Sequence, residues 1–173
     1  MLTDFKKYII RTDNWPRAGI ETYDIGPLLR DKALFHEIIE ELAAPCKGQK
    51  IDAIAGLEAR GFVLAGALAQ KLNTGLVLIR KKGKLPPPTI AQEYSYEYAS
   101  NVIEIQSNSL VSGQNIILVD DVLATGGTMA AAVKLVNRLG VNILGISFVI
   151  SMDFMAGSDR LRGQNIHSLI HYN

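Results

Sequence analysis

The chain has 173 residues, 48% of them hydrophobic, which is enough to bury one full core and too short for two ordinary domains, so we expect a single domain over residues 1–173. Lysine plus arginine number 18 and aspartate plus glutamate 17, and the formal net charge of +1 argues against nucleic acid or an anionic membrane as a partner. Small molecules and copies of the same chain are the expected partners.

The cysteine content and the N-terminal residues indicate in which cellular compartment the protein is expected. Cys46 is the single cysteine of the sequence, which excludes an internal disulfide and a zinc site of repeated Cys-His spacing and fits a reducing cytoplasm. Asp4, Lys6 and Lys7 interrupt the first residues, so no apolar run has the length of a signal peptide. No stretch approaches the roughly 18 apolar residues of a membrane span. We therefore expect a soluble, cytoplasmic protein.

Short apolar runs alternate with helical patterns along the chain. Residues 31–44 predict a helix, because Asp31 is a suitable N-cap and apolar residues recur on one face. Further helices are expected at 61–72 and 128–139, and buried strands at 51–55, 76–79, 115–119, 141–150 and 166–172. Residues 83–100, with three consecutive prolines and three tyrosines, are interpreted as a long loop or excursion of the kind that is usually functional.

This alternation predicts an α/β fold with a mainly parallel central sheet flanked by helices in three layers and right-handed crossovers. Ligands of such sheets bind outside the carboxyl ends of the strands. Three loops are expected there, namely residues 56–61, 80–84 and 120–128. We therefore expect the functional site where these loops meet.

The strongest functional signal follows the strand that ends near Val119. Two acids come first, and a turn rich in glycine and threonine leads into a helix; the residues are Asp120, Asp121, Ala124, Thr125, Gly126, Gly127 and Thr128. Backbone amides at glycines, threonine hydroxyls and a helix N-terminus together bind phosphate, while the acids can accept hydrogen bonds from ribose hydroxyls. A threonine in place of the Walker lysine disfavours a nucleoside triphosphatase. The pattern predicts a cradle for a sugar phosphate; an ordinary strand-turn-helix with solvated aspartates is the alternative.

With these residues the sequence resembles the type I phosphoribosyltransferases, and residues 55–62, 78–86 and 94–98 resemble their adenine-specific subfamily. The resemblance covers nearly the whole chain. It implies the type I fold, with a small N-terminal base-binding hood at residues 1–30 and a flexible catalytic loop at 83–100. It also implies transfer from phosphoribosyl pyrophosphate to adenine, giving AMP and pyrophosphate in purine salvage, with Mg²⁺ held mainly through the substrate, and a homodimer.

The resemblance also implies roles for single residues. Ribose 5-phosphate is expected at Asp120, Asp121 and residues 124–128. Pyrophosphate is expected at Glu58, Ala59, Arg60, Lys81 and Lys84, with a non-proline cis peptide between Glu58 and Ala59. The base is expected at Glu21 and Tyr23, partly through their backbone, with Leu123 as an apolar wall. Arg60 and Glu97 are the expected catalytic residues, Glu97 by steadying the ribosyl cation or handling a purine proton; a surface glutamate is the alternative.

The base-binding segment departs from the family pattern, because residues 21–23, Glu-Thr-Tyr, replace an aliphatic, an aromatic and an arginine residue. This leaves transfer to hypoxanthine, guanine or xanthine as an alternative. A non-catalytic sensor of phosphoribosyl pyrophosphate is a further alternative, although such regulators usually carry a DNA-binding domain for which this chain has no room and no basic surplus. Lesser departures are Pro87, where glycine is usual, and Ser151, where a strand-end glutamate is common.

Overall fold

The structure is a computed structural model that describes residues 3–15, 17–96 and 99–173, with the backbone alone at 95, 96, 99 and 100. Its helices are α1 (Gly26–Arg30), α2 (Lys32–Ala43), α3 (Arg60–Leu72) and α4 (Gly127–Asn137), with 3-10 turns η1 (Phe5–Tyr8), η2 (Ala44–Cys46), η3 (Asp153–Met155) and η4 (Gly157–Leu161). Its strands are β1 (Ile10–Asp13), β2 (Glu21–Asp24), β3 (Ala53–Leu57), β4 (Gly75–Lys81), β5 (Thr89–Tyr96), β6 (Ala99–Gln106), β7 (Asn115–Leu123), β8 (Asn142–Met152) and β9 (Ile166–Tyr172).

The main sheet runs in the order β5-β6-β4-β3-β7-β8-β9, and β1 pairs with β2 in a separate two-stranded ribbon. Strands β4, β3, β7, β8 and β9 run parallel to one another, while β6 is antiparallel to both β4 and β5. The prediction of a mainly parallel α/β sheet is therefore confirmed. The parallel strands bring their carboxyl ends to one edge, where the predicted site loops follow β3, β4 and β7.

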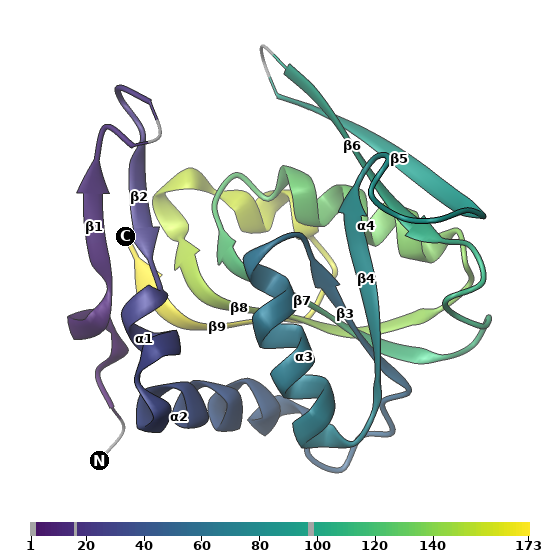
Figure 1. Cartoon of the computed structure of the whole chain (residues 1–173), viewed down its shortest axis with the longest axis horizontal. Helices are drawn as coiled ribbons and strands as arrows, with labels where there is room; N and C mark the ends of the chain where they lie inside the picture. The colour runs from purple at the N-terminus through teal and green to yellow at the C-terminus, as the bar shows by residue number, and fades with distance from the viewer. Residues whose placement is uncertain (1–2, 16, 97–98) are drawn as a thin grey trace.

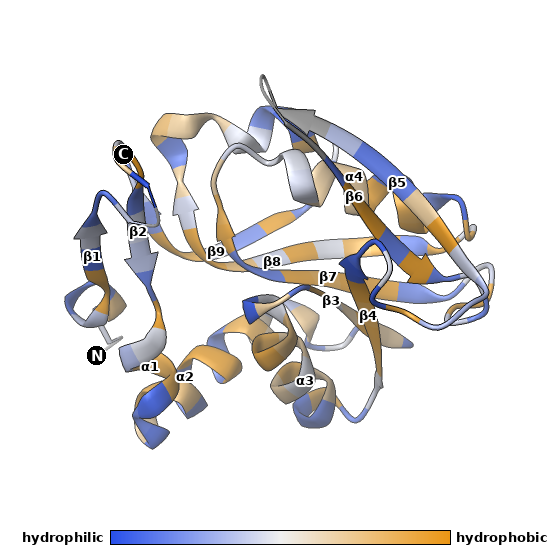
Figure 2. Cartoon of the chain, turned by 45° about the horizontal axis from the view of Figure 1, so that its top comes forward, coloured by the Kyte–Doolittle hydropathy of each residue, from blue (hydrophilic) through white to orange (hydrophobic). Residues whose placement is uncertain are grey.

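Helices cover both faces of the main sheet, with α2 and α3 in front of it and α4 behind it in Figure 1. Figure 2 shows the central strands as largely hydrophobic. On one face Leu64 and Leu68 of α3, one turn apart, are fully buried, and on the other Leu135 and Val136 of α4 are fully buried. The site loops therefore stand on a sheet that is packed from both sides.

The predicted helix at 31–44 is confirmed as α2, which begins one residue later and ends one residue earlier. Asp31 caps it as expected, because its Oδ1 accepts the Ala33 N–H at 2.8 Å and the Leu34 N–H at 3.1 Å. None of the described helices combines the length and the apolar character that a membrane crossing requires.

The interpretation of residues 83–100 as a long loop is wrong, because β5 and β6 form an antiparallel hairpin from the pair Thr89–Gln106 to the pair Tyr96–Ala99. The three prolines occupy only the connection that precedes β5. Along β5 the partly buried Ile90 and Tyr94 alternate with exposed side chains and pack against the core, which is the period of a half-buried strand. Arg138 at the end of α4 donates to the Ala91 carbonyl at 2.7 Å and ties the hairpin to that helix.

Candidate active site

The predicted phosphate cradle forms a pocket of about 70 Å³ where β7 turns into α4. Its lining comprises Asp120, Val122, Leu123, Ala124, Thr125, Gly126, Gly127, Thr128, Met129 and Phe148. Gly126 has a φ of 75°, a left-handed conformation that favours glycine, and α4 begins at the next residue. The N–H groups of the first turn and the positive end of this eleven-residue helix therefore lie at the pocket, as a phosphate site requires.

The two acids at the end of β7 have different surroundings. Asp120 lines the cradle, and its Oδ1 accepts the Asp121 N–H at 2.9 Å. Asp121 is 6% exposed and forms an ion pair with Arg60 through Oδ2 and Nε. Burial, and then the charge of Asp121, raise the pKa of Asp120 well above its usual value. The pair thus offers one carboxylate to the cradle and one to Arg60.

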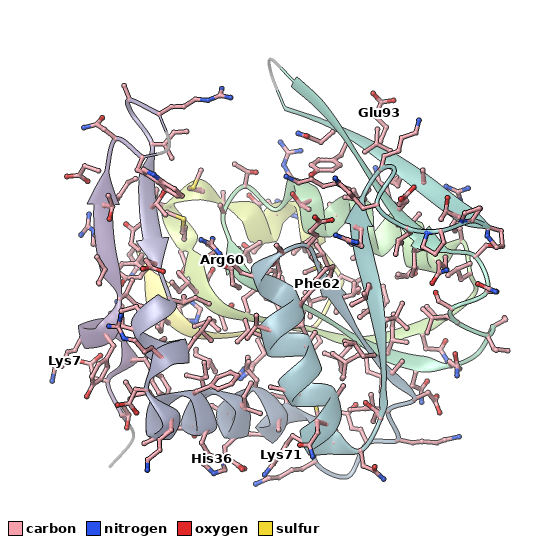
Figure 3. The ribbon with its side chains drawn as sticks, in the orientation of Figure 1. Lys7, His36, Arg60, Phe62, Lys71 and Glu93 are labelled. Carbon is pink, nitrogen blue, oxygen red and sulfur yellow. The ribbon has the colours of Figure 1, made fainter. Side chains whose placement is uncertain are left out.

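Glycine at position 61 allows α3 to approach these acids. A Cβ there would lie 2.9 Å from Asp120 Oδ1 and 2.9 Å from the Val119 carbonyl oxygen. Because Gly61 is the second residue of α3, the start of this helix, including Arg60, fits directly against the end of β7. Figure 3 shows Arg60 at that end of α3, on the side toward β2.

The loop between β3 and α3 contains the expected cis peptide bond between Glu58 and Ala59. The Glu58 side chain faces β4: its Oε2 accepts the Lys81 N–H at 3.0 Å and the Arg80 Nε–H at 3.2 Å. Burial opposes ionisation of this carboxyl, but the Lys81 N–H and the Arg80 guanidinium together lower its pKa. Glu58 therefore binds β4 with its side chain.

Lys81 and Lys84 are exposed at the end of β4 and in the turn that follows it. The turn is held by Glu104, which is 4% exposed and whose Oε1 accepts the N–H groups of Lys84 and Leu85, each at 3.0 Å. Arg80 adds a hydrogen bond to the Lys84 carbonyl at 2.9 Å. Our sequence reasoning missed Glu104, although a lone charge within the apolar run of β6 was a signal for it.

The predicted base-binding residues Glu21 and Tyr23 contact each other and the C-terminal strand. The Tyr23 hydroxyl donates to Glu21 Oε2 at 2.8 Å, and its 5%-exposed ring lies 4.6 Å from that of Tyr172. Arg11 forms an ion pair with Glu21. These side chains share one face of β2, because residues 21 and 23 alternate with 22 and 24.

A second pocket, of about 330 Å³, lies at the other face of β2, and we call it the ribbon pocket. Its lining comprises Thr12, Trp15, Thr22, Asp24 and Arg60. Trp15 and Asp24 belong to the N-terminal segment, residues 1–30, for which the resemblance implied base binding, but neither they nor Thr12 were among the predicted base-binding residues. The alternation of β2 was the signal that could have singled out Asp24. Arg60 lines this pocket and also pairs with Asp121, so the ribbon pocket adjoins the acids of the cradle.

The remaining predicted residues flank the cradle. Leu123 ends β7, is 2% exposed and lines the cradle. Thr128 donates to the Tyr94 hydroxyl at 3.3 Å, so the β5–β6 hairpin touches the cradle from the side opposite the β1–β2 ribbon. Glu93, labelled in Figure 3, marks the exposed side of this hairpin. Glu97 lies outside the described residues, and its predicted role stays a prediction.

Comparisons with known proteins agree with this geometry. The chain matches the phosphoribosyl transferase domain family over residues 29–164. It is 45% identical to an adenine phosphoribosyltransferase of Acidobacterium capsulatum over 96% of this chain and 93% of that protein. It resembles the crystal structure of adenine phosphoribosyltransferase from Thermoanaerobacter pseudethanolicus with a TM-score of 0.95 and 41% identity over 99% of this chain and 100% of that one. The Saccharomyces cerevisiae enzyme, solved with adenine and an imino-altritol bisphosphate, gives a TM-score of 0.90 and 39% identity over 96% of each chain.

Proposed function

Because this chain belongs to the adenine phosphoribosyltransferase family, we propose that it transfers the phosphoribosyl group of phosphoribosyl pyrophosphate to adenine, forming AMP and pyrophosphate in purine salvage. One observation carries the proposal: the phosphate cradle includes Asp120, and Arg60 pairs with the neighbouring Asp121 while it lines a base-sized pocket, so the cradle, the two acids and the pocket follow one another. That order matches the order of phosphate, ribose and base in the product.

The donor is held by the loops that follow β7, β3 and β4. The cradle of residues 124–128 binds the 5-phosphate, and Asp120 and Asp121 accept hydrogen bonds from the ribose hydroxyls. Arg60 and the exposed Lys81 and Lys84 stabilise the negative charge of the pyrophosphate. A guanidinium has five N–H donors, so Arg60 can keep its contact with Asp121 and still bind a phosphate oxygen.

In the reaction, N9 of adenine attacks C1 of the ribose and the bond from C1 to the pyrophosphate oxygen breaks with its electron pair. The proton that the purine ring loses passes to water or to the carboxylate predicted for this step, Glu97. The cations named above stabilise the leaving group. Mg²⁺ fits this edge because its hard oxygen ligands are supplied by the substrate phosphates, with carboxylate oxygens of Asp120 and Asp121 beside them. When bound, the ion neutralises charge on the pyrophosphate.

Asp24 supports adenine over the other purines. It lines the ribbon pocket, and its Oδ1 accepts the Gly26 N–H at 2.8 Å, which fixes the carboxylate. The 6-amino group of adenine is a hydrogen-bond donor and suits such an acceptor, whereas the 6-oxo group of hypoxanthine, guanine and xanthine would meet it with lone pairs. Two hydrogen-bond acceptors that face each other without a donor between them lower the free energy gained on binding.

Supplying phosphoribosyl pyrophosphate and Mg²⁺ with each purine base in turn tests the function. We expect adenine to exceed the 6-oxopurines in kcat/KM by about 10³-fold or more, because a polar mismatch in a site built for hydrogen bonding discriminates strongly. Nucleotide formation is measured by chromatography. Equal turnover of hypoxanthine would contradict adenine specificity, and binding of phosphoribosyl pyrophosphate without any nucleotide product would favour the sensor.

Glu104 gives a second test, directed at the pyrophosphate side. Glu104→Ala leaves the Lys84 and Leu85 N–H groups without their buried acceptor, so we expect unfolding free energy to fall by about 1–3 kcal/mol and KM for phosphoribosyl pyrophosphate to rise. Steady-state kinetics and thermal unfolding measure both effects. Glu104→Gln is the matched control, because its amide oxygen can accept both N–H groups; equal losses in the two variants would contradict the bracing role.

We also propose that the enzyme works as a homodimer in the cytoplasm. Val63 of α3 and Leu76 of β4 are 48% and 44% exposed, and Leu76 Cδ2 is the nearest atom to a Cβ built at Gly66, one turn along α3. The two exposed side chains both lie near the turn of α3 that contains Gly66, and exposed apolar surface commonly marks an interface. Light scattering is expected to give twice the 18.9 kDa mass of the chain.

A further inference from the structure

Trp15 stands at the ribbon pocket with a large exposed surface. It is the single tryptophan of the sequence, it is 58% exposed, and it lines the pocket together with Thr12, Thr22, Asp24 and Arg60. A tryptophan ring of this exposure places apolar surface in contact with water. A flat ligand that covered the ring would remove this surface from water, which favours binding.

We propose that Trp15 is the residue on which the flat face of the acceptor purine stacks. The inference rests on the proposed function and extends it, because it assigns base binding to a side chain outside residues 21–23. Trp15 thereby sets the affinity for the base, while the cradle sets the affinity for the donor.

Tyr23, the aromatic residue of β2, is not placed to stack on the purine. Tyr23 lies on the opposite face, where its ring packs against Tyr172 and its hydroxyl donates to Glu21. On the pocket face, residue 22 is a threonine. Among the side chains that line the ribbon pocket, the aromatic ring is that of Trp15.

Hydrogen bonds hold the loop that carries Trp15. Its carbonyl oxygen accepts the Thr22 hydroxyl at 2.7 Å, and its N–H donates to the Ile20 carbonyl at 3.1 Å. Asn14 next to it accepts the Gly19 N–H at 2.9 Å. The ring is therefore presented from a backbone that is fixed against β2, which lowers the entropic cost of stacking.

The position of the pocket suits a base attached to ribose. Arg60 lines the ribbon pocket and pairs with Asp121, so a purine joined to C1 of a ribose held by the acids extends toward Trp15. The volume of about 330 Å³ lies within the range of small-molecule sites, about 300–1,000 Å³. The mixed lining, one large ring with hydroxyls and a carboxylate, matches a flat heterocycle with polar edges.

Kinetics of Trp15→Ala and Trp15→Phe test the proposal. Loss of a base–aromatic stack is expected to raise KM for adenine by roughly 5- to 150-fold with little change in KM for phosphoribosyl pyrophosphate, and phenylalanine is expected to restore most of the loss. Phe154→Ala is the matched control, since Phe154 is also 58% exposed but lies in η3 outside the ribbon pocket. A rise in KM for phosphoribosyl pyrophosphate equal to that for adenine would overturn the proposal.

Fluorescence of the unmodified enzyme gives a readout that does not depend on a variant folding. Because Trp15 is the single tryptophan, adenine added with ribose 5-phosphate is expected to quench its emission in a saturable manner. If the wild-type chain forms AMP while adenine leaves this emission unchanged and Trp15→Ala keeps the wild-type KM, the stacking role is wrong and the function stands. If the wild-type chain forms no AMP, the function fails and this inference fails with it.

Discussion

Replacing Gly157 with alanine is expected to lower kcat/KM for phosphoribosyl pyrophosphate by about 100-fold, the cost of displacing a binding group by about 1 Å. A Cβ at this position would lie 2.0 Å from the Ala124 carbonyl oxygen and 2.9 Å from the Gly126 nitrogen. Both atoms belong to the backbone of the cradle, so the added methyl group can be accommodated only if the cradle or η4 moves. We also expect the free energy of unfolding to fall by about 1–3 kcal/mol.

Donor-dependent kinetics and denaturant unfolding measure these two effects. Gly75→Ala is the control, because a Cβ there has its nearest neighbour at 3.6 Å, an ordinary van der Waals contact, and β4 begins at this residue, far along the strand from the site. The variant at 157 should differ from this control in KM for the donor as well as in stability. Wild-type donor kinetics in Gly157→Ala would show that η4 does not support the cradle.

Replacing Asp120 with asparagine is expected to stabilise the fold at neutral pH and to impair the enzyme. Burial and the neighbouring Asp121 raise the pKa of Asp120 above the unfolded value of about 3.9, so the folded chain holds this proton more tightly than the unfolded chain does. The stability contributed by protonated Asp120 is therefore complete below the unfolded pKa and declines as pH rises through the folded pKa. Asparagine does not titrate, so the variant lacks this decline, while its Oδ1 can still accept the Asp121 N–H.

Thermal unfolding of both proteins across about pH 4 to 8, a range that starts at the unfolded pKa, measures the effect. The melting temperature of Asp120→Asn minus that of the wild type should grow as pH rises. Asparagine carries an NH2 group in place of one carboxyl oxygen, and loss of that acceptor for a ribose hydroxyl should lower kcat/KM for the donor by about 10- to 100-fold. Asp159→Asn, at an exposed carboxylate of η4 paired with Arg162, should change stability little. Parallel pH profiles for wild type and Asp120→Asn would refute the argument.

Local patterns were sufficient to predict much of the sheet and the cradle. Residues 120–128 follow one another along the chain, so the strand, the acids, the glycine turn and the helix were all visible within one short segment. The hairpin at β5 and β6 was not predicted, because only every second side chain of β5 is partly buried and the prolines before it dominated the interpretation.

Contacts between residues far apart in the sequence could not be predicted from local sequence patterns. Glu104 lies twenty residues from Lys84, and its role depends on β6 pairing with β4 in an antiparallel register. The orientation of β2 likewise depends on the packing of Tyr23 against Tyr172 at the far end of the sequence. Sequence reasoning therefore placed the base near residues 21–23, but it did not show that Thr22 and Asp24, rather than Glu21 and Tyr23, turn their side chains to a pocket.

The β1–β2 ribbon is a sheet of its own, whereas the cradle is built on the main sheet. Specificity for the purine base and affinity for phosphoribosyl pyrophosphate thus depend on residues of two different sheets. Substitutions in the β1–β2 ribbon can therefore change base specificity without changing the packing of the main sheet beneath the cradle. The changes in binding free energy caused by substitutions in the ribbon and in the cradle should largely add, except where a substitution affects Arg60. Base specificity can thus change, by design or in evolution, through substitutions at a few positions within the first 24 residues of the chain.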